Sequence, residues 1–132
     1  MIRSELETVV FSLLKDNGIT TRLFMQDTRD PNYRGEYIEI IPLTFDESNF
    51  YASSIVNVNV HVPDVNGIKN AKRLDTLSEQ VRKIFRQSKD AFESYYTIYR
   101  NGMFSIVSTL DYKEDNNTHF RNFRIKVTYL NL

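Results

Sequence analysis

The sequence lacks several residues on which common functional sites depend. It has 132 residues but no cysteine and no tryptophan, and only four glycines and three prolines. Without cysteine there is no disulfide, thiolate metal site or cysteine nucleophile, and the absence fits a reducing cytoplasm. The four glycines are scattered along the chain, which excludes a glycine-rich phosphate-binding loop.

Long hydrophobic runs are also missing. No apolar run approaches the roughly 20 residues that a membrane-spanning helix needs. The chain begins directly with an amphipathic pattern, without the basic stretch and apolar run of a signal peptide. We therefore expect a soluble, intracellular protein that consists of one domain over residues 1–132.

The net charge is zero, but the charges are unevenly distributed. Residues 1–66 carry five basic and ten acidic side chains, whereas residues 67–132 carry twelve basic and seven acidic ones. A neutral total argues against a dedicated nucleic-acid binder. The asymmetry has two interpretations: opposite charges help one copy dock head-to-tail on the next, or strands from both halves mix the charges in space.

Two amphipathic segments predict helices. The first covers about residues 5–16, where Ser4 and Glu7 have capping-box spacing and Gly18 supplies a stop signal. The second covers about residues 68–85 and has one apolar stripe opposite a charged face. The stripe consists of Leu74, Leu77, Val81, Ile84 and Phe85. Each helix has to bury one face, and a sheet is the expected partner.

Alternating apolar and polar residues predict strands over residues 20–25, 36–43, 50–62, 103–112 and 119–130. The last two form a long antiparallel hairpin around the polar segment 113–118. Residues 92–99 fit a helix by aromatic spacing and a strand by composition, and the turn signal Asn101-Gly102 favours the strand. The predicted fold is α+β, with a mainly antiparallel sheet and two helices packed on one of its faces.

Residues that could perform catalysis or bind a metal are sparse. His61 and His119 lie on predicted strands without a nearby ligand partner, which favours polar-face side chains over metal ligands. Asp27, Asp30 and Asn32 lack the glycine and terminal glutamate of a calcium-binding loop. Paired carboxylates such as Asp46-Glu47 and Glu114-Asp115 fall in turns, where no dry pocket is expected. We expect neither an enzyme nor a required cofactor.

Cations on the second predicted helix are the one feature that could contact nucleic acid. They are Arg73, Arg82, Lys83 and Arg86. Asp75 and Glu79 share the charged face, and no basic–aromatic interleaving marks a base-stacking surface. A solvated helix face is therefore preferred, without sequence-specific nucleic-acid binding.

The order of predicted elements resembles the tail-terminator and tail-completion (neck) proteins of long-tailed bacteriophages and prophages. Four segments carry the resemblance: the amphipathic opening at residues 2–18, the strand IVNVNVHV at 55–62, the helix start at 66–74, and FRNFRIKV at 120–127. The resemblance implies a structural virion-assembly protein without catalytic residues. It implies a homohexameric ring that ends tail-tube growth, joins tail to head, and passes from the host cytoplasm into the virion neck.

Two further function classes stay open: a small α+β module that binds a protein or ligand, and an enzyme whose site has no recognisable pattern. For the ring, residues of a polar loop and of two polar strand faces are candidate contacts with other copies, with the tail tube and with head–tail connector proteins. They are Asp27, Arg29, Asp30, Arg34, Asn57, Asn59, His61, Arg124, Lys126 and Thr128.

Overall fold

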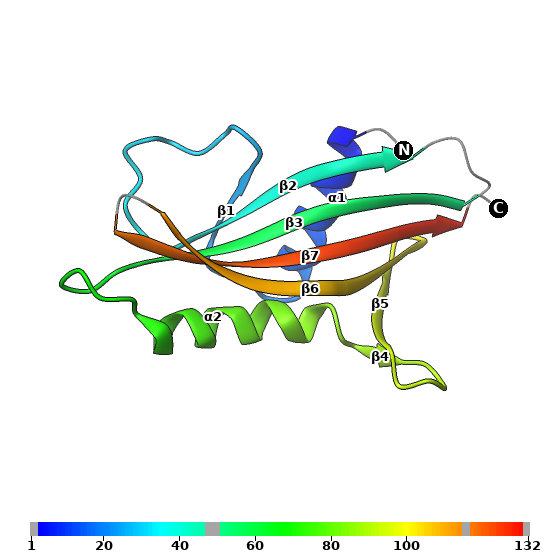
Figure 1. Ribbon diagram of the computed structural model, residues 1–132. Coiled ribbons are helices and arrows are strands. Elements are labelled where there is room, and N and C mark those ends of the chain that lie inside the picture. The colour runs from blue at the N-terminus through cyan, green and yellow to red at the C-terminus, as the bar shows by residue number, and fades with distance from the viewer. Residues whose placement is uncertain (1–2, 47–50, 115–116, 131–132) are drawn as a thin grey trace.

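The computed structural model describes residues 3–46, 51–114 and 117–130 (Figure 1). Along the chain these form α1 (Arg3–Asp16), β1 (Arg22–Met25), β2 (Tyr37–Asp46), β3 (Tyr51–Pro63), α2 (Ala71–Ile84), β4 (Ser88–Lys89), β5 (Tyr95–Tyr99), β6 (Gly102–Glu114) and β7 (Thr118–Leu130). Neither helix among these residues is long and apolar enough to cross a membrane.

The strands form one sheet in the order β1-β2-β3-β7-β6-β5-β4. Only the β1–β2 pair is parallel, and β6 and β7 form the long hairpin that the sequence predicts. Both helices contribute to a single core on one face of the sheet, and they contact each other. The predicted α+β class and the mainly antiparallel sheet are confirmed.

The helix-covered face is almost entirely aliphatic and aromatic. Along β3 and β7 every second side chain enters this core, as the period of two predicts. The buried strand residues are Val56, Val58, Val60, Val62, Phe123, Ile125, Val127 and Tyr129. The helices supply Leu6, Val10, Leu13, Leu14, Leu74, Leu77 and Val81. Burying one such side chain contributes about 1.5–3 kcal/mol.

The C-terminal ends of both helices agree with the sequence prediction, and the N-terminal ends differ. Gly18, at φ 89°, donates to Lys15 and Ile19 donates to Leu14, which is the Schellman arrangement that a C-terminal glycine permits. At the other end α1 already begins at Arg3, so Ser4 lies inside the helix and the predicted capping box is wrong.

Helix α2 begins three residues later than the sequence predicts. Val65 and Ile68 exchange two backbone hydrogen bonds around Asn66 and Gly67, both of which have positive φ. Residue 68 is therefore part of a tight turn and cannot start a helix. Asn70 caps the helix instead, because its side chain accepts a hydrogen bond from the Arg73 amide.

Residues 95–99 are a strand, as the turn signal after them indicates. The turn itself lies one residue earlier than expected, because Arg100 and Asn101 take positive φ and Gly102 already pairs with Tyr99. Gly102 has a packing role, since an added Cβ would lie 3.0 Å from the rings of Phe104 and Tyr129. The short strand β4 was not predicted, because two polar residues show no period.

The sheet order keeps the two charged halves of the chain apart. Strands β1, β2 and β3 come from the acidic half, and β7, β6, β5 and β4 come from the basic half. The halves meet where β3 pairs with β7, so the strands do not alternate between them. The strands of the two halves consequently occupy opposite sides of the sheet, although α2 packs across the boundary onto β3 and Arg73 on α2 donates to Glu36 just before β2.

Candidate interaction surfaces

The face of the sheet opposite the helices, here called the outer face, holds the predicted interface residues of β3 and β7. Asn57 lies opposite Arg124 in the strand register, and Lys126 and Thr128 continue along β7. Arg124 and Lys126 are exposed, and Thr128 and Asn57 are half-buried. Together these four residues form a contiguous polar area on two central strands.

Asn59 and His61 do not belong to this accessible area. Their exposed fractions are 7% and 2%, although the sequence pattern predicts a solvated or partner-facing strand face. Asn59 Oδ1 accepts a hydrogen bond of 2.7 Å from Asn122 Nδ2 on β7. No partner can reach either side chain without first displacing its neighbours.

Stacked rings explain why His61 is buried. The rings of Tyr37, His61, Phe120 and Tyr112 follow one another across β2, β3, β7 and β6, with centroid separations of 4.2, 4.7 and 5.1 Å. The strand register places these residues opposite one another on the outer face. We call this row the ring ladder. Cross-strand aromatic pairs of this kind each add stability to a sheet.

His61 is a neutral side chain in the ladder. Its Nδ1 lies 3.6 Å from Glu114 Oε1, too far for a hydrogen bond, and neither ring nitrogen has a hydrogen-bond partner. Burial, together with a smaller effect of the nearby Arg29 charge, lowers the pKa of His61 to about 3. Burial therefore outweighs the attraction of Glu114, and the two groups do not form an ion pair near neutral pH.

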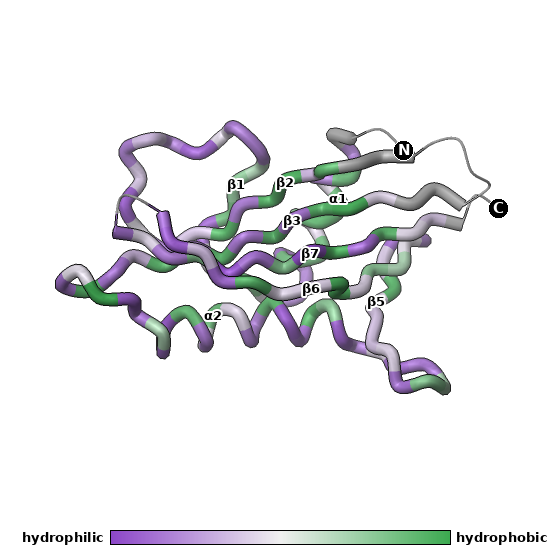
Figure 2. The backbone as a smooth tube through the Cα atoms, viewed as in Figure 1, coloured by the Kyte–Doolittle hydropathy of each residue, from purple (hydrophilic) through white to green (hydrophobic). Residues whose placement is uncertain are grey.

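The loop between β1 and β2 carries the remaining predicted interface residues and is mostly hydrophilic (Figure 2). Arg29 reaches the ladder, with its guanidinium 5.1 Å from the centre of the Tyr37 ring. Asp30 and Arg34 make bonds inside the loop, to the Asn32 amide and to the Pro31 carbonyl respectively. Asp27 is exposed and has a positive φ of 62°.

Arg29 also affects the carboxyl groups at this end of the outer face. Burial raises the pKa of both Glu39 and Glu114, and the charge of Arg29 opposes each shift. Burial and the charge of Glu114 raise the pKa of Tyr37 to about 12. A cavity of about 260 Å³ separates the loop from the β6–β7 turn. It is lined by Arg29, Tyr33, Arg34, Gly35, Tyr37, Pro63, Asp64, Asn117 and Thr118.

A larger groove, of about 670 Å³, lies between α2 and the strands β5, β6 and β7. Its walls include Ser78, Arg82, Arg86, Tyr95, Ile106, Thr109, Arg121 and Phe123. The Ser78 hydroxyl is buried without a hydrogen-bond partner. Sequence reasoning missed this groove and treated Arg82 and Arg86 only as a solvated face. The available signal was Ser78 itself, a polar residue directly after Leu77 in the apolar stripe.

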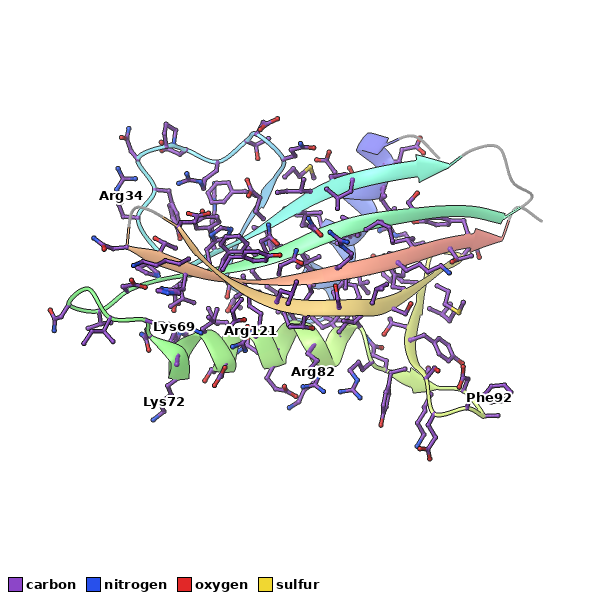
Figure 3. The ribbon with its side chains drawn as sticks, in the orientation of Figure 1. Arg34, Lys69, Lys72, Arg82, Phe92 and Arg121 are labelled. Carbon is purple, nitrogen blue, oxygen red and sulfur yellow. The ribbon has the colours of Figure 1, made fainter. Side chains whose placement is uncertain are left out.

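Ion pairs of Arg121 and Lys69, both labelled in Figure 3, neutralise one end of the groove. Arg121 donates to both oxygens of Asp111 at 2.7 and 3.1 Å, and its Nη1 lies 2.8 Å from Asp75. Lys69 Nζ lies 2.9 Å from Asp111. The hydrogen bond from Arg121 lowers the pKa of Asp111 to about 2, against the effect of burial. The salt bridges hold the strand β6 against the start of α2.

The other end of the groove stays positive. Its lining consists of three cations, one aromatic ring and one carboxylate: Arg82, Lys83, Arg86, Tyr95 and Glu79. The Arg86 guanidinium lies 3.8 Å from the centre of the Tyr95 ring, a cation–π contact. Beyond it, the β4–β5 hairpin projects from the sheet and carries Phe92 at its tip, 90% exposed (Figure 3). Asp90 Oδ1 accepts hydrogen bonds from the Phe92 and Ser94 amides and so shapes this tip.

No protein-family model matches the chain, and no curated protein matches it either. Within residues 3–46, 51–114 and 117–130, no three His, Asp or Glu side chains cluster in a way that could hold a metal ion. His119 instead lies 2.7 Å from Asp64 Oδ1 beside the β6–β7 turn. The described residues offer three candidate interaction surfaces: the outer face, the α2–β6 groove and the β4–β5 tip.

Proposed function

We propose that this chain is a phage-type tail-terminator protein that forms a homohexameric ring. The ring ends growth of the tail tube and joins the tail to the head. In this proposal the protein assembles in the host cytoplasm and then becomes part of the virion neck. Its partners are further copies of itself, the tail-tube protein and the head–tail connector proteins.

The separation of charge across the sheet is the observation that best supports a ring. A closed ring uses a heterologous interface, in which one surface patch of each copy meets a different patch on the next. The half of the chain that supplies β1, β2 and β3 has a net charge of −5 and the half that supplies α2 and β4–β7 has +5, so the two sides of the sheet belong to chain segments of opposite charge. Opposite charges steer these sides together and disfavour contact between two like sides.

The resemblance of the element order to neck proteins gives the ring its specific role. The order of helix, strand, loop, two strands, helix, strand and long hairpin is present in the structure, with β4 added. The exposed Arg124 and Lys126 on the outer face are the residues that we assign to contact with the tail tube. Neither makes an ion pair among the described residues, so both cations are available to an acidic partner.

Tail length is the decisive measurement. Purified protein is added to polymerising tail tubes from its own phage, and electron microscopy records their length and their head-proximal end. We expect tubes of uniform length with density for this protein at that end. The variant Arg124→Glu/Lys126→Glu should lose this capping, whereas Lys72→Glu, on an exposed turn of α2, should retain it. Tubes that keep growing with no terminal density would contradict the proposal.

The α2–β6 groove favours a second candidate, a small module that binds a ligand. Its volume of about 670 Å³ and its apolar wall of Ile106 and Phe123 suit a small molecule. A protein that stays monomeric at all concentrations, and whose melting temperature rises with a compound that Ser78→Leu no longer binds, would favour this candidate over the ring.

A further inference from the structure

The outer edge of β6 lacks a neighbouring strand over its second half. β5 pairs with β6 only at residues 102–104 and bends away from it toward β4 (Figure 1). A bulge between Ile106 and Ser108 follows, after which β6 keeps a continuous register with β7 from Ser108 to Glu114. Among the described strands, none pairs with the opposite edge of this regular stretch. Its unpaired backbone groups are a template for another strand.

The α2–β6 groove lies beside this edge on the helix-covered side of the sheet. Ile106 and Thr109 of β6 line the groove, and Thr109 is exposed. Ser78 lines it from α2, and its hydroxyl has no hydrogen-bond partner although the residue is only 3% exposed. A ligand group that bonds to this hydroxyl would remove the cost of leaving it unpaired. Every second side chain of an added strand would enter the groove, since successive side chains point to opposite faces.

The charges that line the groove favour an acidic strand. Ion pairs already match the carboxylates at the end near the start of α2. At the other end Arg82, Lys83 and Arg86 share the lining with one carboxylate, Glu79. None of these three cations makes an ion pair among the described residues. The neighbouring residues 105–110 of β6 carry no charge, so the local excess is positive and attracts acidic side chains.

The outer-face side of the same edge is apolar. Leu110 and Tyr112 are 55% and 46% exposed. They lie opposite Asn122 and Phe120 in the strand register, which places both on the outer face. The remaining alternate side chains of an added strand would cover them and remove apolar surface from water. The expected strand is therefore polar and acidic on one face and apolar on the other.

This chain does not itself supply a strand of that kind. The outermost strands of its sheet, β1 and β4, carry no acidic residue. If β6 paired with β6 of a second copy, the acidic residue on the groove side would be Asp111, which already binds Arg121 and Lys69. Charge and the available bonds therefore favour a segment of a different protein.

We propose that residues 108–114 of β6 and the α2–β6 groove bind an extended acidic segment of another protein, which joins the sheet as an extra strand. Its carboxylates at the end nearest Ile106 meet Arg82 and Arg86, and one of its polar groups bonds to the Ser78 hydroxyl. Main-chain hydrogen bonds supply affinity in such a complex, and alternate side chains supply specificity. The site does not depend on a ring, because one copy of the chain contains all of it.

A library of random peptides of about ten residues, displayed on phage and panned against the purified full chain, tests this chemistry without assuming a sequence. We expect the enriched peptides to combine acidic with alternating apolar residues and to lack proline. The best synthetic peptide should bind Arg82→Glu/Arg86→Glu at least about tenfold more weakly than the wild type. The control Lys15→Glu/Lys72→Glu changes the net charge equally at exposed sites outside the groove, and should stay within about twofold.

Two further measurements distinguish strand addition from simple attraction of charge. Amide hydrogen exchange should show new protection in residues 108–114 when the peptide binds, because edge amides become hydrogen-bonded. Two copies of the peptide, N-methylated at alternate residues in opposite phases, should differ in affinity. In a strand at a sheet edge, only one phase of backbone donors faces the neighbouring strand.

Several results would overturn the proposal. They are no enrichment over panning without the protein, enriched peptides without acidic residues, equal binding by both double variants, equal binding of the two N-methylated peptides, and protection confined to residues outside β6. Self-association of the free chain that protects residues 108–114 would assign the edge to a second copy and would also contradict the proposal. None of these results concerns tail length, so the strand site and the tail-terminator role can fail separately.

Discussion

The two faces of the sheet are built from different chemistry. The helix-covered face buries aliphatic and aromatic side chains from every large element, including Leu77 and Val127. Neither of the described helices covers the outer face, which instead has the ring ladder, with the neutral His61 between Tyr37 and Phe120. Three of the five buried polar atoms without a hydrogen-bond partner, among the described residues, lie on the outer face: Asn57 Oδ1 and both His61 ring nitrogens.

This difference distinguishes residues that stabilise the fold from polar residues that stability does not explain. An unsatisfied buried polar atom costs about 1–3 kcal/mol. On the helix-covered side this cost falls on Tyr129 Oη and on Ser78 Oγ of α2, among many buried apolar side chains. The outer face accepts it at Asn57, which lies opposite the exposed Arg124, and at His61, four residues further along β3. Stability alone does not explain these polar residues, which is consistent with an outer face that contacts a partner.

Truncating the helix-covered core should have the largest effect. Leu77→Ala removes a side chain that is 2% exposed, so we expect a loss of about 2–5 kcal/mol in the free energy of unfolding. Urea denaturation measures this loss, and Thr76→Ala, on the exposed side of the same helix turn, is the control. A Leu77→Ala midpoint equal to that of the wild type would mean that α2 does not cover the core.

Acid should destabilise the protein through His61, which is buried on the outer face. The pKa of His61 is about 3 in the folded protein and about 6.5 in an unfolded chain. Between these values the unfolded chain binds a proton that the folded protein does not, so stability is lost as the pH falls through this window. From about pH 7 to about pH 4 this single group lowers the free energy of unfolding by about 3 kcal/mol.

Other groups titrate in the same window, so the comparison is made against His61→Phe. The raised pKa values of Glu39 and Glu114 act in the opposite direction, and the lowered pKa of Asp111 adds to the loss below about pH 4. Urea midpoints at the two pH values should differ more for the wild type than for His61→Phe. Parallel pH profiles of the two proteins would show that His61 is not buried in neutral form.

At neutral pH the same variant should have a smaller effect of opposite sign. His61→Phe keeps a ring between Tyr37 and Phe120 and removes two unsatisfied nitrogens. We expect a neutral to stabilising change, up to about 1 kcal/mol in the free energy of unfolding. His61→Ala, which breaks the ladder, is the matched control and should be destabilising. Destabilisation by His61→Phe would mean that a ring nitrogen has a partner in solution.

The smallest effect is expected at the rim, away from both faces. Glu36 binds Arg73 through two hydrogen bonds of 2.6 and 2.9 Å, and both side chains are partly exposed. Water and salt screen such a pair, so Glu36→Gln should cost no more than about 0.5 kcal/mol. A double-mutant cycle with Arg73→Gln, measured at low and high salt, isolates the pair. A coupling energy much larger than this would mean that the Glu36–Arg73 pair contributes as much to stability as the buried contacts do.

Most of the fold could be predicted because its signals are local and periodic. The alternation along residues 56–62 and 123–129 and the apolar stripe of α2 are readable without any tertiary information. The features that the sequence predicted wrongly or not at all have tertiary or conformational causes. The start of α2 moved because Asn66 and Gly67 adopt positive φ, and β4 exists only because Ser88 and Lys89 lie beside Tyr96 and Tyr95.

The candidate surfaces were less predictable, because contacts between distant residues decide exposure. The polar pattern of β3 locates Asn57, Asn59 and His61 on one face, but the burial of His61 depends on rings from β2 and β7. The α2–β6 groove likewise depends on how β5 diverges from β6 after three paired residues. Neither arrangement produces a periodic pattern in the sequence from which it could be predicted.

The pairing of β3 with β7 has a consequence for how the protein is made. These central strands join residues 51–63 to residues 118–130, so the two sides of the sheet remain separate until the ribosome has released β7. Until then β3 has an open edge, and long-range pairings of this kind form slowly. During synthesis the nascent chain consequently exposes one edge of the valine-rich strand β3 until β7 is available to pair with it, and an unpaired strand edge is a template for aggregation.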